Sequence, residues 1–384
     1  MKPISHLQFL TRRRIEAGAF LLVFFLIFGF LGGRMGTANL INTIMATAYD
    51  LLIKTVFYIM AITVLSGALS RLLIEFGVVR LLEYLFSPLM RPIYNLPGVA
   101  ALGGIMTFFS DNPAIIGLLK DKNFNRYFKP YQLVSLTNFG TAFGMGLVVL
   151  TFMASLGYFK AALIGVVGAA FGGMISTRLM QRSIRNSPFL RESKVEKGAT
   201  DKIILKKEGT IFLRFLNAIL DGGKTGVELG LTIIPGVLII STMVMILTFG
   251  PSNPAVGYQG LAYEGVKVLP WLASKVNWLF EGLFGFQHPE LIAFPITSLG
   301  AVGAALGLVK QFIASGFING GVVAVFTAMG MCWSGFLSTY TAMYDSIGYR
   351  GLLSKGLLAQ TIGGICAGIF AHWLYVLISL FVTL

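Results

Sequence analysis

Residues 108–122 read FFSDNPAIIGLLKDK, and the polar tetrapeptide Ser110-Asp111-Asn112-Pro113 stands between two apolar segments. Pro113 has no backbone N–H, and a residue that precedes proline is disfavoured in the α-helical region, so a helix is expected to break here. Two short apolar arms joined by a polar turn are typical of a re-entrant hairpin. The stretch therefore predicts a hairpin that enters a membrane and returns to the same face.

The composition of the whole chain supports a membrane environment. Of its 384 residues, 55% are hydrophobic and 12% are charged, and the 32 phenylalanines and 46 glycines are typical of close helix packing in lipid. This length provides roughly eight to ten membrane elements of about 20 residues each. The sequence predicts an all-α polytopic protein of the cell (inner) membrane.

Clustered basic residues predict the orientation of the spans. Arginines 12–14, the group from Lys120 to Lys129 and the segment 178–207 are rich in positive charge, which favours the cytoplasmic side. The N-terminus is then cytoplasmic and the C-terminus outside, with Lys267, Lys275 and Lys310 as scattered exceptions. Nucleic-acid binding is not indicated. The expected spans lie at about 17–33, 52–70, 131–157, 160–178, 226–249, 318–342 and 356–380.

The two halves of the chain repeat one another. VRLLEYL (79–85) matches VKVLPWL (266–272), GLLK (117–120) matches GLVK (307–310), and TNFGTAFG (137–144) matches TAMGMCWS (327–334). The charge pattern gives the two units opposite topology, so an inverted repeat is expected. We expect an N-terminal helix at 1–36, repeat 1 at 37–180 with a hairpin at about 96–120, a basic cytoplasmic linker at 181–224, and repeat 2 at 225–384 with a hairpin at about 285–311.

The first hairpin carries the strongest candidate site. Its arm from Pro97 to Ser110 spans about 20 Å, which places the tetrapeptide near the middle of the membrane. Side-chain oxygens and the free N–H groups of the second arm can hold a cation or an anionic or polar solute. The alternative is that Asp111 only caps the second arm. The candidates in this half are Ser110, Asp111, Asn112, Thr137, Asn138 and Thr141.

The second hairpin supplies an uncharged counterpart. By the repeat offset, Ser110 corresponds to Gly300, so the second turn is Thr297-Ser298-Leu299-Gly300. The next span adds Trp333, Ser334 and Thr339. Gln287 and Glu290 lie near the mouth of this hairpin, either as solute ligands or as the cap of an interfacial helix. Most serines and threonines in membrane helices bond to their own backbone, whereas Asn138 needs other partners.

Motifs for catalysis and metal binding are missing from the sequence. The three histidines are isolated, both cysteines lie in apolar segments, and no phosphate-binding loop, nucleophile elbow or paired-carboxylate motif is present. We therefore expect neither an enzyme nor a resident cofactor. Transport would draw on Na⁺ or H⁺ as the coupling ion, or on the gradient of the solute itself.

The segments 110–115, 129–133 and 137–142 together resemble the gate, or nucleoside-recognition, superfamily. This superfamily includes concentrative nucleoside transporters, the gate regions of ferrous-iron permeases, spore maturation proteins and a dipicolinate exporter. In the nucleoside transporters the first turn reads Gly-Gln-Thr-Glu-Ala-Pro and binds the base, whereas this chain has Asp111-Asn112 and no Gln-x-Glu pair. The resemblance implies a concentrative-nucleoside-transporter-like core and a homo-oligomer, dimer or trimer.

The sequence thus predicts an ion-coupled, elevator-type transporter of a small polar or anionic solute, nucleoside-like or a carboxylate. One alternative is an ion or divalent-metal permease, which needs more carboxylate, His or Cys ligands than the chain places together. Another is a non-transporting membrane assembly factor of the spore maturation kind. The substrate, the coupling ion and the direction of transport are left open.

Overall fold

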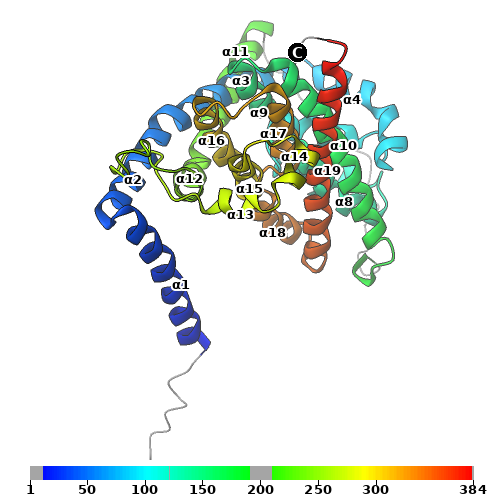
Figure 1. The fold of residues 1–384 in the computed structure, drawn as a ribbon. Helices are drawn as coiled ribbons and strands as arrows, with labels where there is room; N and C mark the ends of the chain where they lie inside the picture. The colour runs from blue at the N-terminus through cyan, green and yellow to red at the C-terminus, as the bar shows by residue number, and fades with distance from the viewer. Residues whose placement is uncertain (1–11, 121, 191–209, 383–384) are drawn as a thin grey trace, which may run out of the picture.

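The computed structural model describes residues 12–120, 122–190 and 210–382, and within these ranges the chain is helical, without a named β-strand. Seven helical segments in the described part are long and apolar enough to cross a membrane. Together with two shorter hairpins they form the all-α membrane fold that the sequence predicts, with two inverted repeats (Figure 1).

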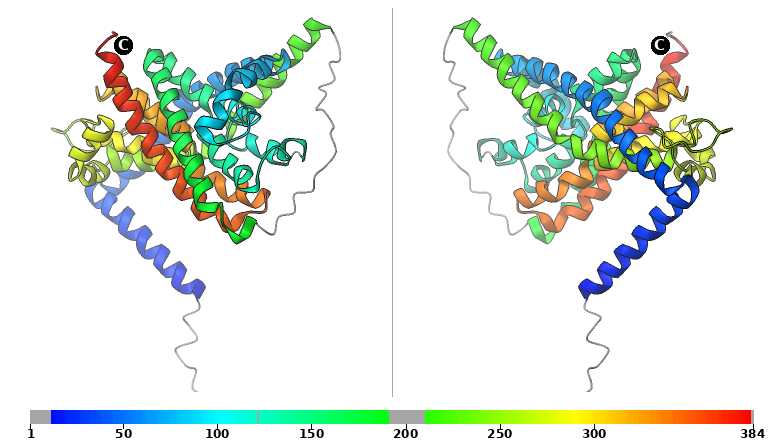
Figure 2. Two further views of the ribbon diagram at one scale, coloured as in Figure 1. Left: turned by 90° about the vertical axis from the view of Figure 1, so that its right-hand side faces the viewer. Right: turned by 90° about the vertical axis from the view of Figure 1, so that its left-hand side faces the viewer.

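The first helix, α1 (Arg12–Met35), projects from the rest of the molecule, as Figures 1 and 2 show. Its large apolar side chains, such as Phe20 and Phe25, are exposed along most of its length. Only its C-terminal end packs inward, where Leu31 and Met35 are buried. A helix that is apolar on all sides and has few protein contacts is suited to lipid.

Two long helical rods, one from each repeat, form the scaffold. The first consists of α2 (Thr37–Asp50), the π-helical η2 (Leu51–Val56) and α3 (Phe57–Glu75); the second consists of α11 (Ile211–Thr232), the π-helical η5 (Gly236–Ser241) and α12 (Thr242–Thr248). Helices α3 and α11 lie side by side (Figure 2). A methyl group on Gly67 would lie 2.4 Å from the Gly222 carbonyl oxygen, so the two backbones touch.

Each rod is followed by comparable elements, namely short helices, a hairpin, a broken span and a long closing helix. Repeat 1 continues with α4 (Val78–Leu89), η3 (Met90–Tyr94), α5 (Ala100–Phe109), α6 (Ala114–Lys120), α7 (Lys122–Asn125), α8 (Pro130–Thr141), α9 (Gly146–Ser155), α10 (Phe159–Ile184) and η4 (Pro188–Leu190). Repeat 2 continues with α13 (Val268–Ser274), α14 (Asn277–Phe284), η6 (Pro289–Ile292), α15 (Ala293–Gly300), α16 (Val302–Ala314), α17 (Gly320–Trp333), α18 (Phe336–Ser346), η7 (Arg350–Leu352) and α19 (Leu353–Ser379). We call α5 with α6 hairpin 1, and α15 with α16 hairpin 2.

Two of the spans expected to be continuous are broken. The span expected at 131–157 is interrupted between α8 and α9, where Met145 has φ 51°. The span expected at 318–342 is interrupted between α17 and α18, where Ser334 and Gly335 have φ of 30° and 71°. These left-handed residues reverse the local backbone and end the helix. Apolar composition alone did not reveal either break.

Helix boundaries also differ from the expected ones around the linker. Helix α10 ends at Ile184 and α11 begins at Ile211, so helices occupy both ends of the segment 181–224. The first rod begins at Thr37, well before the expected start at residue 52, because its polar residues Thr43 and Thr47 are buried inside the protein. The basic residues at 191–209 and the first 11 residues lie outside the described ranges.

The closing helices of the two repeats, α10 and α19, run side by side (Figure 2). A methyl group on Gly172 would lie 2.4 Å from the Gly363 carbonyl oxygen, so glycines again permit direct backbone contact. Helices α8 and α17 pack against this pair. The breaks that end α8 and α17 therefore lie at the core of the fold, next to the hairpins.

Candidate functional site

The turn of hairpin 1 is formed by the polar tetrapeptide that interrupts the apolar sequence. Helix α5 ends at Phe109 and α6 begins at Ala114. The Asp111 carboxylate accepts a hydrogen bond from the Asn112 backbone N–H (2.7 Å), and the Ser334 hydroxyl lies 3.5 Å from it. The first N–H groups of α6 bond to backbone carbonyls of residues 111–113. The Asp111 side chain therefore does not cap α6 and is directed toward the other repeat.

Asn112 connects the two repeats directly. Its side chain is completely buried, and its Nδ2 donates to the Ser334 carbonyl at 2.7 Å. Its Oδ1 is buried without a hydrogen-bond partner among the described residues. Most buried polar atoms in proteins have a partner, so this unpaired acceptor is an exception that a ligand or an ordered water would satisfy.

The turn of hairpin 2 reaches the same place from the other side. Gly335 donates its backbone N–H to the Ser298 carbonyl at 2.9 Å, and the Ser338 hydroxyl donates to the Gly300 carbonyl at 2.9 Å. A methyl group on Gly335 would lie 3.0 Å from the Gly300 carbonyl oxygen. The break between α17 and α18 is thus bonded to both hairpin turns.

The break between α8 and α9 completes this arrangement. A methyl group on Gly144 would lie 1.8 Å from Asn112 Oδ1 and 2.7 Å from Ser334 Oγ. Only glycine fits between these side chains. We call Asp111, Asn112, Gly144, Ser334 and Gly335 the tip cluster, because they join both hairpin turns to both helix breaks.

Several predicted ligands satisfy their hydroxyls within their own helix. Thr141 donates to the Thr137 carbonyl (2.8 Å), Thr297 to the Ala293 carbonyl (2.7 Å) and Ser298 to the Pro295 carbonyl (2.8 Å). Thr339 donates to the Gly335 carbonyl at 3.3 Å, and Ser110 ends α5 in a half-buried position. These contacts follow the local bonding usual for such side chains. The hydroxyl of Ser298 is thus bonded within its own helix, and it is the backbone carbonyl of Ser298 that contacts the tip cluster, at Gly335.

Asn138 lies in a separate and well-bonded network. Its Nδ2 lies 3.0–3.1 Å from three acceptors, namely Ser176 Oγ, the Gly356 carbonyl and Gln360 Oε1. The Tyr344 hydroxyl donates to its Oδ1 at 3.3 Å, and Thr137 Oγ1 lies 3.1 Å from that hydroxyl. All of these side chains are buried. The network links α8, α10, α18 and α19.

Gln360 is the centre of this network. Its Oε1 accepts from Ser176 Oγ at 2.6 Å and from the Tyr340 hydroxyl at 3.0 Å, while its Nε2 donates to the Cys332 carbonyl. The Trp333 indole donates to the backbone carbonyl of Gln360 at 3.2 Å. We call Asn138, Ser176, Tyr340, Tyr344 and Gln360 the Gln360 network. Its hydrogen bonds hold the core helices together.

Within the described residues, no hydrogen bond or ion pair joins Gln287 or Glu290 to the tip cluster. Gln287 is exposed, and the buried Glu290 carboxylate forms an ion pair with Lys267 at 3.1 Å. This pair joins the start of α13 to η6, so it braces the base of hairpin 2. No hydrogen bond links it to the hairpin turn among the described residues. The geometry fits the interfacial alternative for these two residues.

Sequence reasoning missed Ser176, Tyr340, Tyr344, Gln360, Gly144 and Gly335. Gln360 carried a usable signal, because an amide side chain within an apolar span needs polar partners as Asn138 does. The two glycines carried none, since the chain contains 46 and only the three-dimensional contacts distinguish them. Within the described residues, no group of three His, Cys, Asp or Glu side chains is placed to hold a metal ion.

This combination of inverted repeats, two hairpins and two broken helices that meet at one cluster defines a secondary-transporter fold. Solved structures share it. The chain superposes on a CNTnw variant in an outward-facing state with a TM-score of 0.56 and 13% identity, over 94% of this chain and 85% of that one. For CNTnw in an inward-facing substrate-bound state the TM-score is 0.53 and the identity 14%, over 98% and 88%.

Part of the chain is similar in sequence to a protein named for sporulation. The sporulation integral membrane protein YlbJ of Bacillus subtilis (strain 168) is 34% identical over 121 residues, which is 30% of this chain and 28% of YlbJ. No family model matches the chain. The two similarities support the resemblance to the nucleoside-recognition and spore maturation superfamily, and they indicate a multi-pass membrane protein.

Proposed function

We propose that this protein is a secondary transporter of a small polar or anionic solute, and that the solute binds at the tip cluster. The observation that carries the proposal is the convergence of both hairpin turns on the broken helix α17–α18, through Asn112 with Ser334 and Ser298 with Gly335. Irregular backbone at membrane depth is tolerated where it lines a buried or aqueous site. Such positions hold solutes in transporters with inverted repeats.

The helix ends at the tip cluster supply groups for both a solute and an ion. Helices α9, α16 and α18 begin beside it, and their first N–H groups favour negative charge. Helices α8, α15 and α17 end beside it and present carbonyl groups. Together with the Asp111 carboxylate and the unpaired Asn112 Oδ1, these carbonyls suit Na⁺ as the coupling ion, and the carboxylate alone could instead take up a proton.

The chemistry of the first turn favours a carboxylate-bearing or other small polar solute over a nucleoside. Asp111-Asn112 stands where the resemblance places a Gln-x-Glu pair, so the donors and acceptors that would read a base are different. The fold shared with CNTnw, solved in outward-facing and inward-facing states, supports alternating access to one site. In this proposal the hairpins and the α8, α10, α17 and α19 core move as an elevator past the α3–α11 scaffold.

The membrane arrangement belongs to the same proposal. The basic residues put the N-terminus in the cytoplasm and the C-terminus outside, in the cell (inner) membrane. A homo-oligomer, dimer or trimer, would hold the scaffold rods fixed while the hairpins move. The long exposed face of α1 offers apolar surface for lipid or for such a neighbour.

A thermal-shift screen followed by transport measurements tests the proposal. The purified protein is heated with nucleosides, dicarboxylates and metal ions, with and without Na⁺, and a binding solute raises the melting temperature. Uptake of that solute is then measured in proteoliposomes. We expect the double variant Asp111→Ala, Asn112→Ala to abolish both effects. Unchanged uptake by this variant would show that the solute does not bind at the tip cluster.

A second candidate function is a non-transporting membrane assembly factor. The observation in its favour is the similarity to YlbJ, which is named for sporulation and not for transport. In that case no solute in the screen would stabilise the protein, and the double variant would change only its association with partner proteins. No grouping of potential metal ligands among the described residues favours the divalent-metal permease.

A further inference from the structure

Helix α16 of hairpin 2 lies across the place where the two scaffold rods meet. The π-helical segments η2 and η5 contact one another, and α16 packs on both. A methyl group on Gly307 would lie 3.4 Å from Ser241 Oγ of η5 and 3.6 Å from Leu51 of η2. The hairpin therefore rests directly on both π-helical segments.

Polar bonds join the hairpin to both segments. Lys310 of α16 donates from Nζ to the Lys54 backbone carbonyl in η2 at 2.8 Å. Ser241 of η5 donates from its hydroxyl to the Ala304 carbonyl in α16 at 2.8 Å. A π-helical turn changes the hydrogen-bond ladder and leaves a carbonyl without its ordinary helical partner. Lys310 binds a carbonyl within such a turn.

Lys310 is held at this position by a second contact. Its ammonium lies 3.9 Å from the centroid of the Tyr58 ring, which belongs to the same rod as Lys54. This distance is within the range of a cation–π interaction. Both contacts of the Lys310 ammonium are therefore made to the scaffold, although the residue itself belongs to the hairpin.

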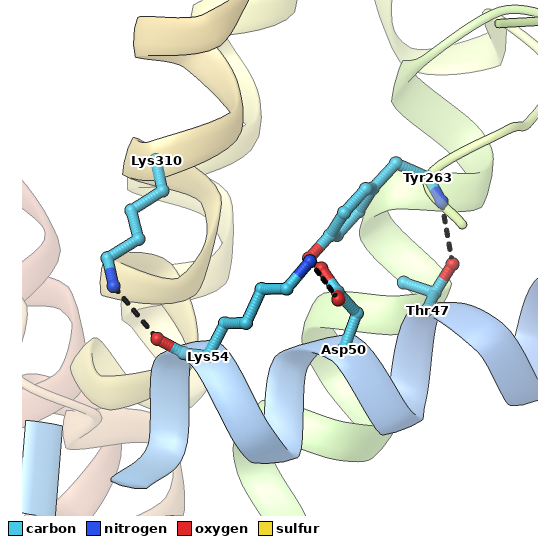
Figure 3. A network of polar contacts seen from close by, with 5 residues as sticks. All are labelled: Thr47, Asp50, Lys54, Tyr263 and Lys310. Atoms are coloured by element: carbon cyan, nitrogen blue, oxygen red, sulfur yellow. Dashed lines mark hydrogen bonds and ion pairs between the residues drawn. The ribbon is translucent and has the colours of Figure 1, made fainter. Parts of the chain in front are cut away.

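The side chain of Lys54 itself does not take part in this contact. The Lys54 ammonium turns away along the rod and pairs with Asp50, which also accepts a hydrogen bond from the Tyr263 hydroxyl (Figure 3). Tyr263 donates its backbone N–H to Thr47 Oγ1 at 2.8 Å. Asp50 is therefore paired with Lys54. The Lys310 ammonium contacts the Lys54 backbone carbonyl and the Tyr58 ring instead.

A second example of this chemistry lies within the described residues. Arg178 of α10 donates from Nε to the Ile93 carbonyl at 2.6 Å and from its guanidinium to the Pro92 carbonyl, both in the π-helical η3. A basic side chain from another element again binds carbonyls of a π-helical segment. Here both elements belong to repeat 1, so the contact stabilises one unit. Lys310 differs because it connects elements of the two repeats.

We infer that Lys310 is a latch that holds hairpin 2 against the scaffold, and that its bonds to Lys54 and Tyr58 must break before the hairpin can move. The inference rests on the proposed elevator function, because only a moving hairpin needs a releasable contact. Gly303 and Gly307 carry no side chains where α16 packs on the scaffold, so they present no projecting group against its movement. Lys310, together with Ser241, then sets how long the described state persists.

A distance measurement by pulsed electron paramagnetic resonance tests the latch without any solute. Spin labels are placed on the exposed positions Met45→Cys of the scaffold and Ser315→Cys of the hairpin, after Cys332 and Cys366 are replaced by alanine. We expect one narrow distance with Lys310 intact. In Lys310→Met a second distance should appear, with about a tenfold shift in the ratio of the two states.

Three further variants make the result decisive. Lys310→Arg keeps the charge and the donors, so it should retain the narrow distance, while Ser241→Ala should shift the ratio in the same direction as Lys310→Met. Lys275→Met is the matched control, because Lys275 lies 3.8 Å from the Trp271 ring within one segment. An unchanged distance distribution in folded Lys310→Met and Ser241→Ala would overturn the latch. Since no solute is present, absence of transport would leave this result standing.

Discussion

Asn112 and Asn138 are both completely buried asparagines of repeat 1, and both contact repeat 2. Asn138 has hydrogen-bond partners for both ends of its amide, whereas Asn112 keeps one donor bond and an unpaired Oδ1. Buried polar groups that are fully bonded stabilise a fold, and an unpaired one is costly. The difference separates a structural network from a position that we assign to the solute.

The largest expected effect comes from removing hydrogen bonds of the Gln360 network, to which Asn138 belongs. Gln360→Leu removes one hydrogen-bond partner from each of Asn138, Ser176 and Tyr340, which should lower the free energy of unfolding by about 3 kcal/mol. Thermal melting of the purified protein measures the loss. Thr361→Ala is the control, because Thr361 bonds only the Leu357 carbonyl of its own helix. Equal melting temperatures for Gln360→Leu and the wild type would contradict a structural role for the network.

The next effect comes from filling the space beside Asn112. Gly144→Ala places a methyl group 1.8 Å from Asn112 Oδ1, so the hairpin turn must shift, and we expect a loss of about 2 kcal/mol together with solute binding. Gly117→Ala on the same hairpin meets no atom within 4 Å and should be neutral or slightly stabilising. Solute-dependent thermal shifts of both variants check this expectation. Wild-type binding by Gly144→Ala would separate the solute from the tip cluster.

Glu264 is a third buried polar group, and it lies outside the membrane spans. Like Asn138, it is fully bonded within the protein. Burial alone would raise the pKa of its carboxyl, but backbone N–H bonds from residues 252, 259, 260 and 261 outweigh burial and lower that pKa. The resulting stability is present above the ordinary value of 4.5 and is lost as the pH falls through the lowered pKa.

Hydrogen exchange of the segment 250–264 at decreasing pH measures this smallest effect. We expect Glu264→Gln to weaken the segment at neutral pH by about 1 kcal/mol and to remove its dependence on acid. Glu281→Gln, which changes an exposed carboxylate of α14, should leave the exchange unchanged. Acid-dependent opening that persists in Glu264→Gln would assign the titration to another group.

The sequence predicted the membrane class, the repeat and the position of the first hairpin turn, because Pro113 and a run of polar residues in an apolar setting are local signals. The helix breaks at Met145 and Ser334 were not predictable in this way. Both depend on left-handed backbone at residues that ordinarily continue a helix, and contacts between repeats favour that conformation.

For the site, the sequence identified Asn112 and Ser334, which the structure brings together. The sequence also placed Asn138 among the site candidates. An amide within an apolar span looks the same in the sequence whether it binds the protein or a solute. Only the arrangement around Gln360 shows that Asn138 is already bonded. Glu290 was grouped for its charge, and its partner Lys267 lies 23 positions away in the sequence.

The most direct test of the assignment measures stability and solute binding in two matched variants, Asn112→Ala and Asn138→Ala. Asn112→Ala loses one bond to the Ser334 carbonyl but also removes a costly unpaired acceptor, so the account predicts that it melts closer to the wild type than Asn138→Ala does. Its solute affinity should fall at least about tenfold, since one bond to the solute is removed. Asn138→Ala should melt at a clearly lower temperature and keep its affinity while folded. The opposite pattern, with affinity lost in Asn138→Ala and retained in Asn112→Ala, would contradict the placement of the solute at the tip cluster.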